Sequence, residues 1–156
     1  MIVGAGPNLG VAIARRFGRE GFSVGLVSRN QEKLDGLAGE LEADGITAAG
    51  AAADIRDSDG LAAAKMLDAG HGTILFTTGG AAIKPHPLRA RVGVSFAGEV
   101  AYARMLHEEV APRGVHVAHT AIPGRIAPGE DHEPEDVAEI LWSHHANRGG
   151  FQTVVE

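Results

Sequence analysis

The first residues that suggest a chemical role lie at the start of the chain, in the segment "VGAGPNLG" at 3–10. An apolar run precedes this segment and a helical pattern follows it, so its backbone N–H groups are expected at a helix N-terminus. Such groups and the helix dipole together favour an anion, usually a phosphate. Gly4 and Gly6 fit the Gly-x-Gly-x-x-Gly pattern, but Leu9 takes the third position and the glycine follows at Gly10. The alternative is a turn that binds nothing.

The elements that would position this segment alternate between short apolar runs and helical patterns. This alternation implies parallel strands joined by right-handed crossovers. We therefore expect an α/β fold, a Rossmann-like doubly wound parallel sheet of about six strands with helices on both faces. We predict strands at 1–6, 22–28, 46–54, 73–78, 115–122 and 151–155, and helices at 8–20, 30–45, 57–70, 94–111 and from Pro134 onward.

A second glycine pattern fits the opening segment better. The short-chain dehydrogenase/reductase family uses Thr-Gly-x-x-x-Gly-x-Gly, and the sequence resembles it with Val3, Gly4 and Gly10 in place and Asn8 at the middle glycine. Asparagine is the best non-glycine residue for a positive φ, so Asn8 is an acceptable replacement there.

Further segments resemble the same family, in the same order along the chain. The resemblance implies a single NAD(P)-binding domain over residues 1–156, in which Asp54 and Ile55 border the adenine. Pro123 and Gly124 would form the turn next to the nicotinamide, and Ile126 would contact its carboxamide. The segments are LVSRN (26–30), AADI (52–55), GTILFTTGG (72–80), AIPGRI (121–126) and GGFQTVV (149–155).

The end of the predicted second strand indicates which dinucleotide would bind. An acidic residue at that place accepts from the ribose 2′-OH and selects NAD. Here the position is Ser28, followed by Arg29 and Asn30. A hydroxyl and a guanidinium suit a 2′-phosphate. We therefore predict that NADP(H) binds, with NAD(H) as the second choice. The alternative is that Arg29 is only an exposed arginine at a strand end. The predicted cofactor-binding residues are Gly4, Gly6, Asn8, Leu9, Gly10, Ser28, Arg29, Asn30, Asp54, Ile55, Pro123, Gly124 and Ile126.

The catalytic pair that the resemblance would require is missing. The positions of the family's tyrosine and lysine fall on Val92 and Phe96, and no Tyr-x-x-x-Lys occurs in the chain. The only tyrosine, Tyr102, lies about ten residues further on. The position of the family's serine is Gly79, or Thr78 if the alignment shifts by one residue.

One β-α unit of the family is also missing, since a single short helix bridges Asp54 to Thr73. That unit normally supplies a relay asparagine and part of the dimer-forming helices, so homo-oligomerisation stays open. Without it, we expect the 73–78 strand to lie next to the first strand, with Thr78 nearer to the nicotinamide.

Thr78 and His86 are the remaining catalytic candidates. Thr78 could polarise a carbonyl, and His86, in the loop at 79–93, could act as a general acid; a solvent-exposed loop is the alternative. We therefore hold two hypotheses, an NADP(H)-dependent oxidoreductase acting on a carbonyl or alcohol, and a catalytically inactive nucleotide-binding module that serves as a sensor or partner subunit. A third is a fold without a competent cofactor site.

Composition excludes several other classes of protein. Cysteine is absent, the net charge is −6, and no basic cluster forms, which argues against thiolate chemistry, nucleic acid and anionic membranes. We expect no signal peptide, no membrane span and a cytoplasmic location. We predict no metal site, because His116 and His119 lie three apart on a strand and point to opposite faces. His144 and His145 are expected to complement the negative end of a helix.

Overall fold

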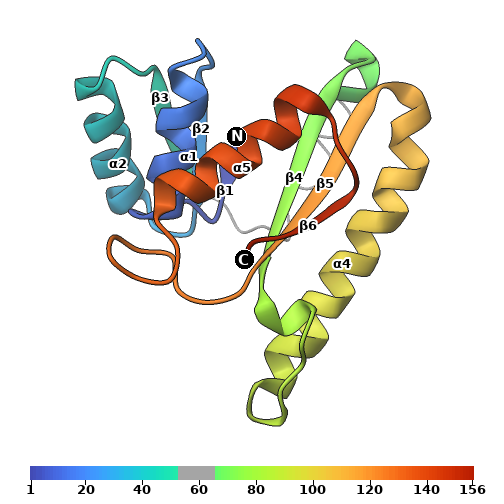
Figure 1. Cartoon of the computed structure of the whole chain (residues 1–156). Coiled ribbons are helices and arrows are strands. Elements are labelled where there is room, and N and C mark those ends of the chain that lie inside the picture. The colour runs from blue at the N-terminus through green and yellow to red at the C-terminus, as the bar shows by residue number, and fades with distance from the viewer. Residues whose placement is uncertain (53–65) are drawn as a thin grey trace. The chain divides into compact units, whose positions relative to one another are not determined.

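A computed structural model of the chain describes residues 1–52 and 66–156. It contains six parallel strands with helices between them, which confirms the predicted α/β fold class (Figure 1). The chain divides into two compact units. Unit 1 comprises Met1–Leu61 and Ile126–Trp142, and unit 2 comprises Ala62–Arg125 and Ser143–Glu156.

Unit 1 contains a three-stranded parallel sheet in the order β1-β2-β3. Leu26 of β2 lies opposite Ile2 of β1, and Val24 opposite Ala48 of β3. The elements of this unit are β1 (Ile2–Val3), α1 (Leu9–Gly18), β2 (Val24–Ser28), α2 (Gln31–Ala43), β3 (Ala48–Ala52) and the part of α5 (Pro134–Asn147) up to Trp142.

The core of unit 1 forms between its sheet and the helices α1 and α2. The predicted helix at 30–45 forms as α2, and its buried face carries Leu34 and Leu41, which are fully buried, with Leu37 packed against the same core. Asn30 caps α2, its side-chain oxygen accepting from the Lys33 N–H at 2.9 Å, as N-cap residues do. The buried residues of this core are Val11, Ala14, Val24, Leu26, Leu34, Leu41, Ile46 and Ala48.

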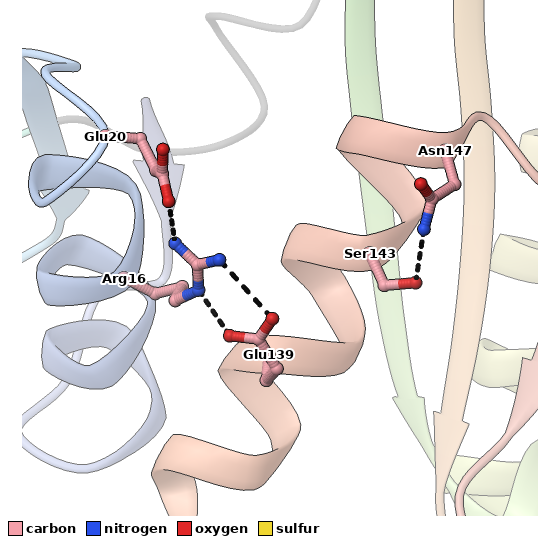
Figure 2. Close-up of polar contacts among 5 residues, drawn as sticks. All are labelled: Arg16, Glu20, Glu139, Ser143 and Asn147. Carbon is pink, nitrogen blue, oxygen red and sulfur yellow. Dashed lines mark hydrogen bonds and ion pairs between the residues drawn. The ribbon is translucent and has the colours of Figure 1, made fainter.

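Arginines of α1 connect the helices of unit 1. The Arg15 guanidinium lies 2.6 Å from Glu40 Oε1 and 2.8 Å from Asp44 Oδ2 at the end of α2. Arg16 pairs with Glu20 at 2.7 Å and with the Glu139 carboxylate of α5 (Figure 2). These side chains are partly exposed, so they orient the helices more than they stabilise them.

Unit 2 contains the second parallel sheet, in the order β4-β5-β6. Every residue of the central strand β5 is buried. Val110 of α4 packs with Val115 and Val117 of β5 to form the apolar core, against which Phe76 of β4 also lies. The elements are β4 (Gly72–Gly79), η2 (Gly80–Ala82), η3 (Pro87–Arg89), α4 (Ala90–Val110), η4 (Ala111–Arg113), β5 (Val115–Ile122), β6 (Gln152–Val154) and α5 from Ser143.

The structure forms two three-stranded sheets where the sequence predicted one sheet. Gly4 has a φ of 74°, which takes the backbone out of the extended conformation, so β1 ends after Ile2 and Val3. Such a short strand offers few backbone groups to a neighbour. The 73–78 run lies within β4, which pairs along its whole length with β5.

The predicted loop at 79–93 contains more regular structure than the sequence indicated. Two short 3-10 helices form there, and α4 begins at Ala90, four residues earlier than predicted. Pro87 suits the first turn of η3 because its fixed φ is helical and no N–H is lost there. Asp54 and Ile55 lie outside the described residues. Among the helices described, none combines the length and the apolar character that crossing a membrane requires.

Candidate functional site

The glycine-rich segment of unit 1 forms the turn from β1 into α1, as predicted. The N–H groups of Gly4 and Ala5 both donate to the Val27 carbonyl, at 2.8 and 3.1 Å, which fixes the turn to β2. A Cβ on Gly10 would lie 3.1 Å from the Cα of Ala5. Glycine is therefore needed at residue 10 because α1 begins against the turn, whereas at residue 4 it is needed for its positive φ.

The start of α1 carries backbone donors without acceptors. The Val11 N–H donates to the Gly6 carbonyl at 3.2 Å and the Ala12 N–H to the Asn8 carbonyl at 3.1 Å. A Cβ on Gly4 or Gly6 would meet no described atom within 4 Å, so the space beside the turn is open. An anion suits such a group of donors at the positive end of a helix. Within residues 1–52 and 66–156, no acceptor faces the amides of Gly6, Asn8, Leu9 and Gly10.

Asn8 differs from its expected conformation. Its φ is −93°, so the premise that it replaces a glycine of positive φ is wrong. It occupies the N-cap position of α1 without a side-chain capping bond. Its amide nitrogen donates instead to the carbonyl of Ile126, at 3.4 Å. The structure thus brings together two predicted cofactor residues that lie 118 positions apart.

Ser28, Arg29 and Asn30 form the second part of the candidate site in unit 1. Ser28 ends β2, and its hydroxyl accepts a long hydrogen bond, 3.5 Å, from the Asn30 N–H. Arg29 is exposed, and its guanidinium forms no ion pair with any residue that the structure describes. The side chain of Asn30 is committed to capping α2. Ser28 and Arg29 are thus the members of this group whose donors can reach a ligand.

Thr78 in unit 2 is buried and hydrogen-bonded. Only 4% of the residue is exposed, and its Oγ1 lies 2.8 Å from Nε2 of His119, which is fully buried. From the sequence, His119 was weighed only as a metal ligand, and its pairing with Thr78 was not predicted. The register explains it: Thr78 lies opposite Ala121 and Phe76 opposite His119, so the two side chains are diagonal neighbours on one sheet face.

Burial determines the charge of His119. Desolvation lowers the pKa of His119 below its ordinary value of 6.5, and the nearby Arg104 guanidinium acts in the same direction. The ring is therefore neutral at pH 7 and carries one proton. Its Nδ1 has no partner among the described residues. The Thr78 hydroxyl is consequently either the donor to Nε2 or the acceptor from it, according to the tautomer.

His86 is exposed and caps a short helix. Its Nδ1 accepts from the Leu88 N–H at 3.2 Å, at the start of η3. A neutral ring that accepts at Nδ1 carries its proton on Nε2. His86 therefore retains a donor that faces away from the cap.

Predicted nicotinamide-side residues follow β5 in unit 2. A Cβ on Gly80 would lie 2.9 Å from Cβ of Pro123, so the start of η2 packs closely on this proline. Gly124 has a φ of 102° and completes the turn. Phe96, at the position of the family's lysine, also approaches the end of β4, since a Cβ on Gly79 would lie 3.2 Å from its ring. An apolar ring thus stands where the resemblance would require a cation.

The histidines near the end of α5 lie in its last turn, where the sequence predicted them. Burial lowers the pKa of His144 and of His145 below 6.5, which disfavours the charged form of both rings. The His145 Nδ1 lies 2.9 Å from the Thr73 hydroxyl. In the part of the chain that the structure describes, no three histidine, aspartate or glutamate side chains are grouped to hold a metal ion.

Comparison with known proteins gives matches in sequence and in fold. Residues 1–64 match the model of the short chain dehydrogenase family. No curated protein matches the chain. A short-chain dehydrogenase from Rhodopseudomonas palustris has a similar structure, with 25% sequence identity and a TM-score of 0.84 over 99% of this chain and 95% of that one.

Two further solved structures of similar fold contain a cofactor. A short-chain dehydrogenase from Sphingobium yanoikuyae, in complex with NADPH, has 17% identity and a TM-score of 0.82 over 98% of this chain and 85% of its own. A metagenomic short-chain oxidoreductase, in complex with NADP, has 21% identity and a TM-score of 0.80 over 99% and 94%. The sequence match at the glycine-rich end and the shared fold together make the chain similar to the short-chain dehydrogenase/reductase family.

Proposed function

We propose that the protein is an NADP(H)-dependent oxidoreductase that acts on a carbonyl or alcohol substrate. The observation that carries the proposal is the set of backbone amides without acceptors at the start of α1, next to the open space over Gly4 and Gly6. A pyrophosphate supplies the negative charge and the acceptors that these donors lack. Proteins of similar fold that hold NADPH or NADP support the choice of ligand.

The adenosine end of the cofactor is assigned to the loop after β2. Arg29 would pair with the 2′-phosphate, and the Ser28 hydroxyl would donate to it. Asp54 and Ile55 stay predictions for the adenine, and Ile126, Pro123 and Gly124 stay predictions for the nicotinamide. In this proposal residues 1–156 act as one dinucleotide-binding domain.

The cofactor supplies a hydride when it is bound, and the chain or water must supply the proton. Thr78 can donate to a substrate carbonyl only when His119 Nε2 carries its proton and donates to Thr78 Oγ1, at 2.8 Å. In the other tautomer the Thr78 hydroxyl donates to His119 Nε2 and cannot donate to a substrate. His86, whose Nε2 is exposed, is the second candidate donor.

A second candidate function is a nucleotide-binding module without catalysis. Thr78 is nearly inaccessible, and Phe96 stands at the position of the family's lysine. Under this alternative the dinucleotide binds but is not consumed. Steady-state assays of NADPH oxidation with a panel of aldehydes and ketones distinguish the two, and Thr78→Val and His86→Ala identify the proton donor if turnover occurs.

Calorimetric titration with NADPH tests the cofactor assignment. Gly6→Val should weaken binding at least tenfold without changing the melting temperature, because its side chain enters open space where the phosphates would lie and its backbone does not require a positive φ. Gly39→Val on α2, also in open space, is the matched control and should bind like the parent. If the parent protein binds neither NADPH nor NADH, the proposal is wrong.

The preference between the two dinucleotides tests the loop after β2. Ser28→Asp combined with Arg29→Ala should weaken NADPH binding by roughly tenfold to a hundredfold, the range of a lost charge-assisted hydrogen bond. NADH binding should be retained or improved, since a carboxylate accepts from the ribose hydroxyl. Unchanged NADPH affinity would place the 2′-phosphate elsewhere.

A further inference from the structure

The core of unit 2 contains an unusual number of histidines around β5. His116 and His119 lie three residues apart on this strand, and His144 and His145 come from α5. Exposure of His116, His119 and His144 is 7%, 0% and 8%. Each of these three keeps one buried ring nitrogen without a hydrogen-bond partner among the described residues, namely His116 Nε2, His119 Nδ1 and His144 Nε2.

Within residues 1–52 and 66–156, the charged group that acts on His119 is a base, Arg104, and no acid stabilises a proton on the ring. From α4, Arg104 lies over the Phe151 ring at 4.5 Å, and that ring stacks on His119 with centroids 6.4 Å apart. From β4, the neutral Thr78 hydroxyl provides the hydrogen bond. A protonated His119 would therefore lie in an apolar site beside a permanent cation.

His116 also faces bases from the elements packed against it. The His107 ring of α4 lies 6.4 Å from the His116 ring and is fixed by a 2.9 Å contact between its Nδ1 and the Val117 carbonyl. From α5 and the residue after it, the bases His144, His145 and Arg148 all disfavour a positive charge on His116. The groups that act on His116 in the described structure are thus all bases.

These surroundings determine whether acid raises or lowers the stability of unit 2. Burial lowers the pKa of His116, His119 and His144 below the ordinary value of 6.5. The folded unit therefore binds fewer protons than the unfolded chain in acid. Their contribution to stability is complete above pH 6.5 and is lost as the pH falls from 6.5 through the lower folded values. Glu99 of α4 acts oppositely, since burial raises its pKa above 4.5, but it is one group.

We propose that unit 2 is an acid-sensitive unit, in which the β4-β5-β6 sheet opens reversibly when His116, His119 and His144 take up protons while the unit 1 sheet stays closed. This device does not depend on the proposed oxidoreductase activity. Three protons enter from solvent on opening and leave on closing, and no covalent bond changes.

Unit 1 provides the internal reference because its described residues include no buried histidine. The Arg16 guanidinium lowers the pKa of the Glu139 carboxyl below 4.5, so this pair persists until the pH falls below that value. Among the described residues of unit 1, the α-amino group of Met1 acts like the histidines, because burial lowers its pKa below 8.0. Between pH 6.5 and 4.5, unit 2 should therefore lose stability while the Arg16–Glu139 pair of unit 1 persists.

Native-state hydrogen exchange at pH 7.5 and 5.5, corrected for intrinsic exchange rates, tests the proposal. A histidine that stayed fully neutral in the folded unit would raise its opening constant about tenfold between these pH values, so about a thousandfold is the upper limit for three. Amides of β4 and β5 should lose protection in this direction, up to that limit. Amides of β2 and β3 should lose less protection than those of β4 and β5. Equal loss in both sheets, or no loss in β5, would overturn the proposal.

Variants separate the buried histidines from the exposed ones. His116→Gln with His119→Gln and His144→Gln should abolish the pH dependence in β5, whereas His71→Gln with His86→Gln, both exposed, should leave it unchanged. If the triple variant does not fold, proton NMR of the parent protein replaces it. The ring signals of the three buried histidines should change only together with the loss of β5 protection, and a ring that titrates while β5 stays protected would contradict the mechanism.

Discussion

The two units have the same architecture but bury different kinds of side chain in their cores. Each has three parallel strands with helices packed on them. Unit 1 buries aliphatic side chains and places its arginine–carboxylate pairs at the surface. Unit 2 buries His116, His119 and Thr120 along its central strand. All histidines except His132 lie in unit 2.

This difference shows that the arrangement of parallel strands does not determine how the stability of a unit depends on pH. A buried leucine contributes to stability through the apolar area removed from water, which is independent of pH. A buried neutral histidine contributes only while it stays neutral. The strand β2, with Val24, Leu26 and Val27 buried, and the strand β5, with His116 and His119 buried, represent these two cases.

The largest effect is expected for Leu34→Ala in unit 1. The side chain is fully buried on α2, so its removal should lower the free energy of unfolding by about 2–5 kcal/mol. Because no charge is involved, the loss measured by urea denaturation should be the same at pH 7.5 and pH 5.5. A loss that changes with pH would show that the two units do not respond independently.

The next largest effect is expected for Thr78→Val in unit 2. The substitution leaves both ring nitrogens of the buried His119 without a partner, which should lower the free energy of unfolding by about 1–3 kcal/mol. Adding His119→Phe removes the unpaired nitrogens, so the double variant should be less destabilised than the sum of the single ones. Simple additivity would mean that the 2.8 Å contact contributes nothing.

Much of the fold could be predicted from the sequence. The order of strands and helices follows from alternating apolar runs and helical patterns, and the predicted strand at 115–122 matches β5 at both ends. Strand β1 was predicted too long, because glycine at residue 4 was treated as part of the strand. Its φ of 74° ends the strand there, and a backbone angle cannot be deduced from residue type alone.

The site could be predicted less well, because its contacts depend on register and burial. The turn at 3–10 was predicted from the glycine spacing. The pairing of Thr78 with His119 could not be predicted, because it joins two strands whose relative register is not evident from the sequence. Histidine is intermediate in its preference for burial, so residue type did not reveal that His144 would be buried while His86 would be exposed.

A smaller effect is expected at the cap of α2, which also bears on the cofactor site. Asn30→Ala removes the acceptor of the Lys33 N–H and should cost about 1 kcal/mol in urea denaturation. Asn30→Asp keeps the cap and should preserve stability. It also places a carboxylate next to Arg29, so NADPH binding should weaken while folding does not. Parent-like NADPH affinity in this variant would argue against a 2′-phosphate at the loop after β2.

The smallest effect is expected for Arg15→Met, which tests whether the surface pairs of unit 1 contribute to its stability. The guanidinium bridges Glu40 and Asp44 but is partly exposed, so solvent screens the pairs and their loss should cost only about 0.5 kcal/mol. Methionine retains an apolar stem, which separates lost charge from lost packing. The cost should fall further between 0.05 and 0.5 M NaCl, because screening weakens exposed pairs. If the loss of stability in Arg15→Met is the same in high salt, Arg15 stabilises unit 1 through packing and not through its ion pairs. The two units would then differ only in the side chains of their buried cores.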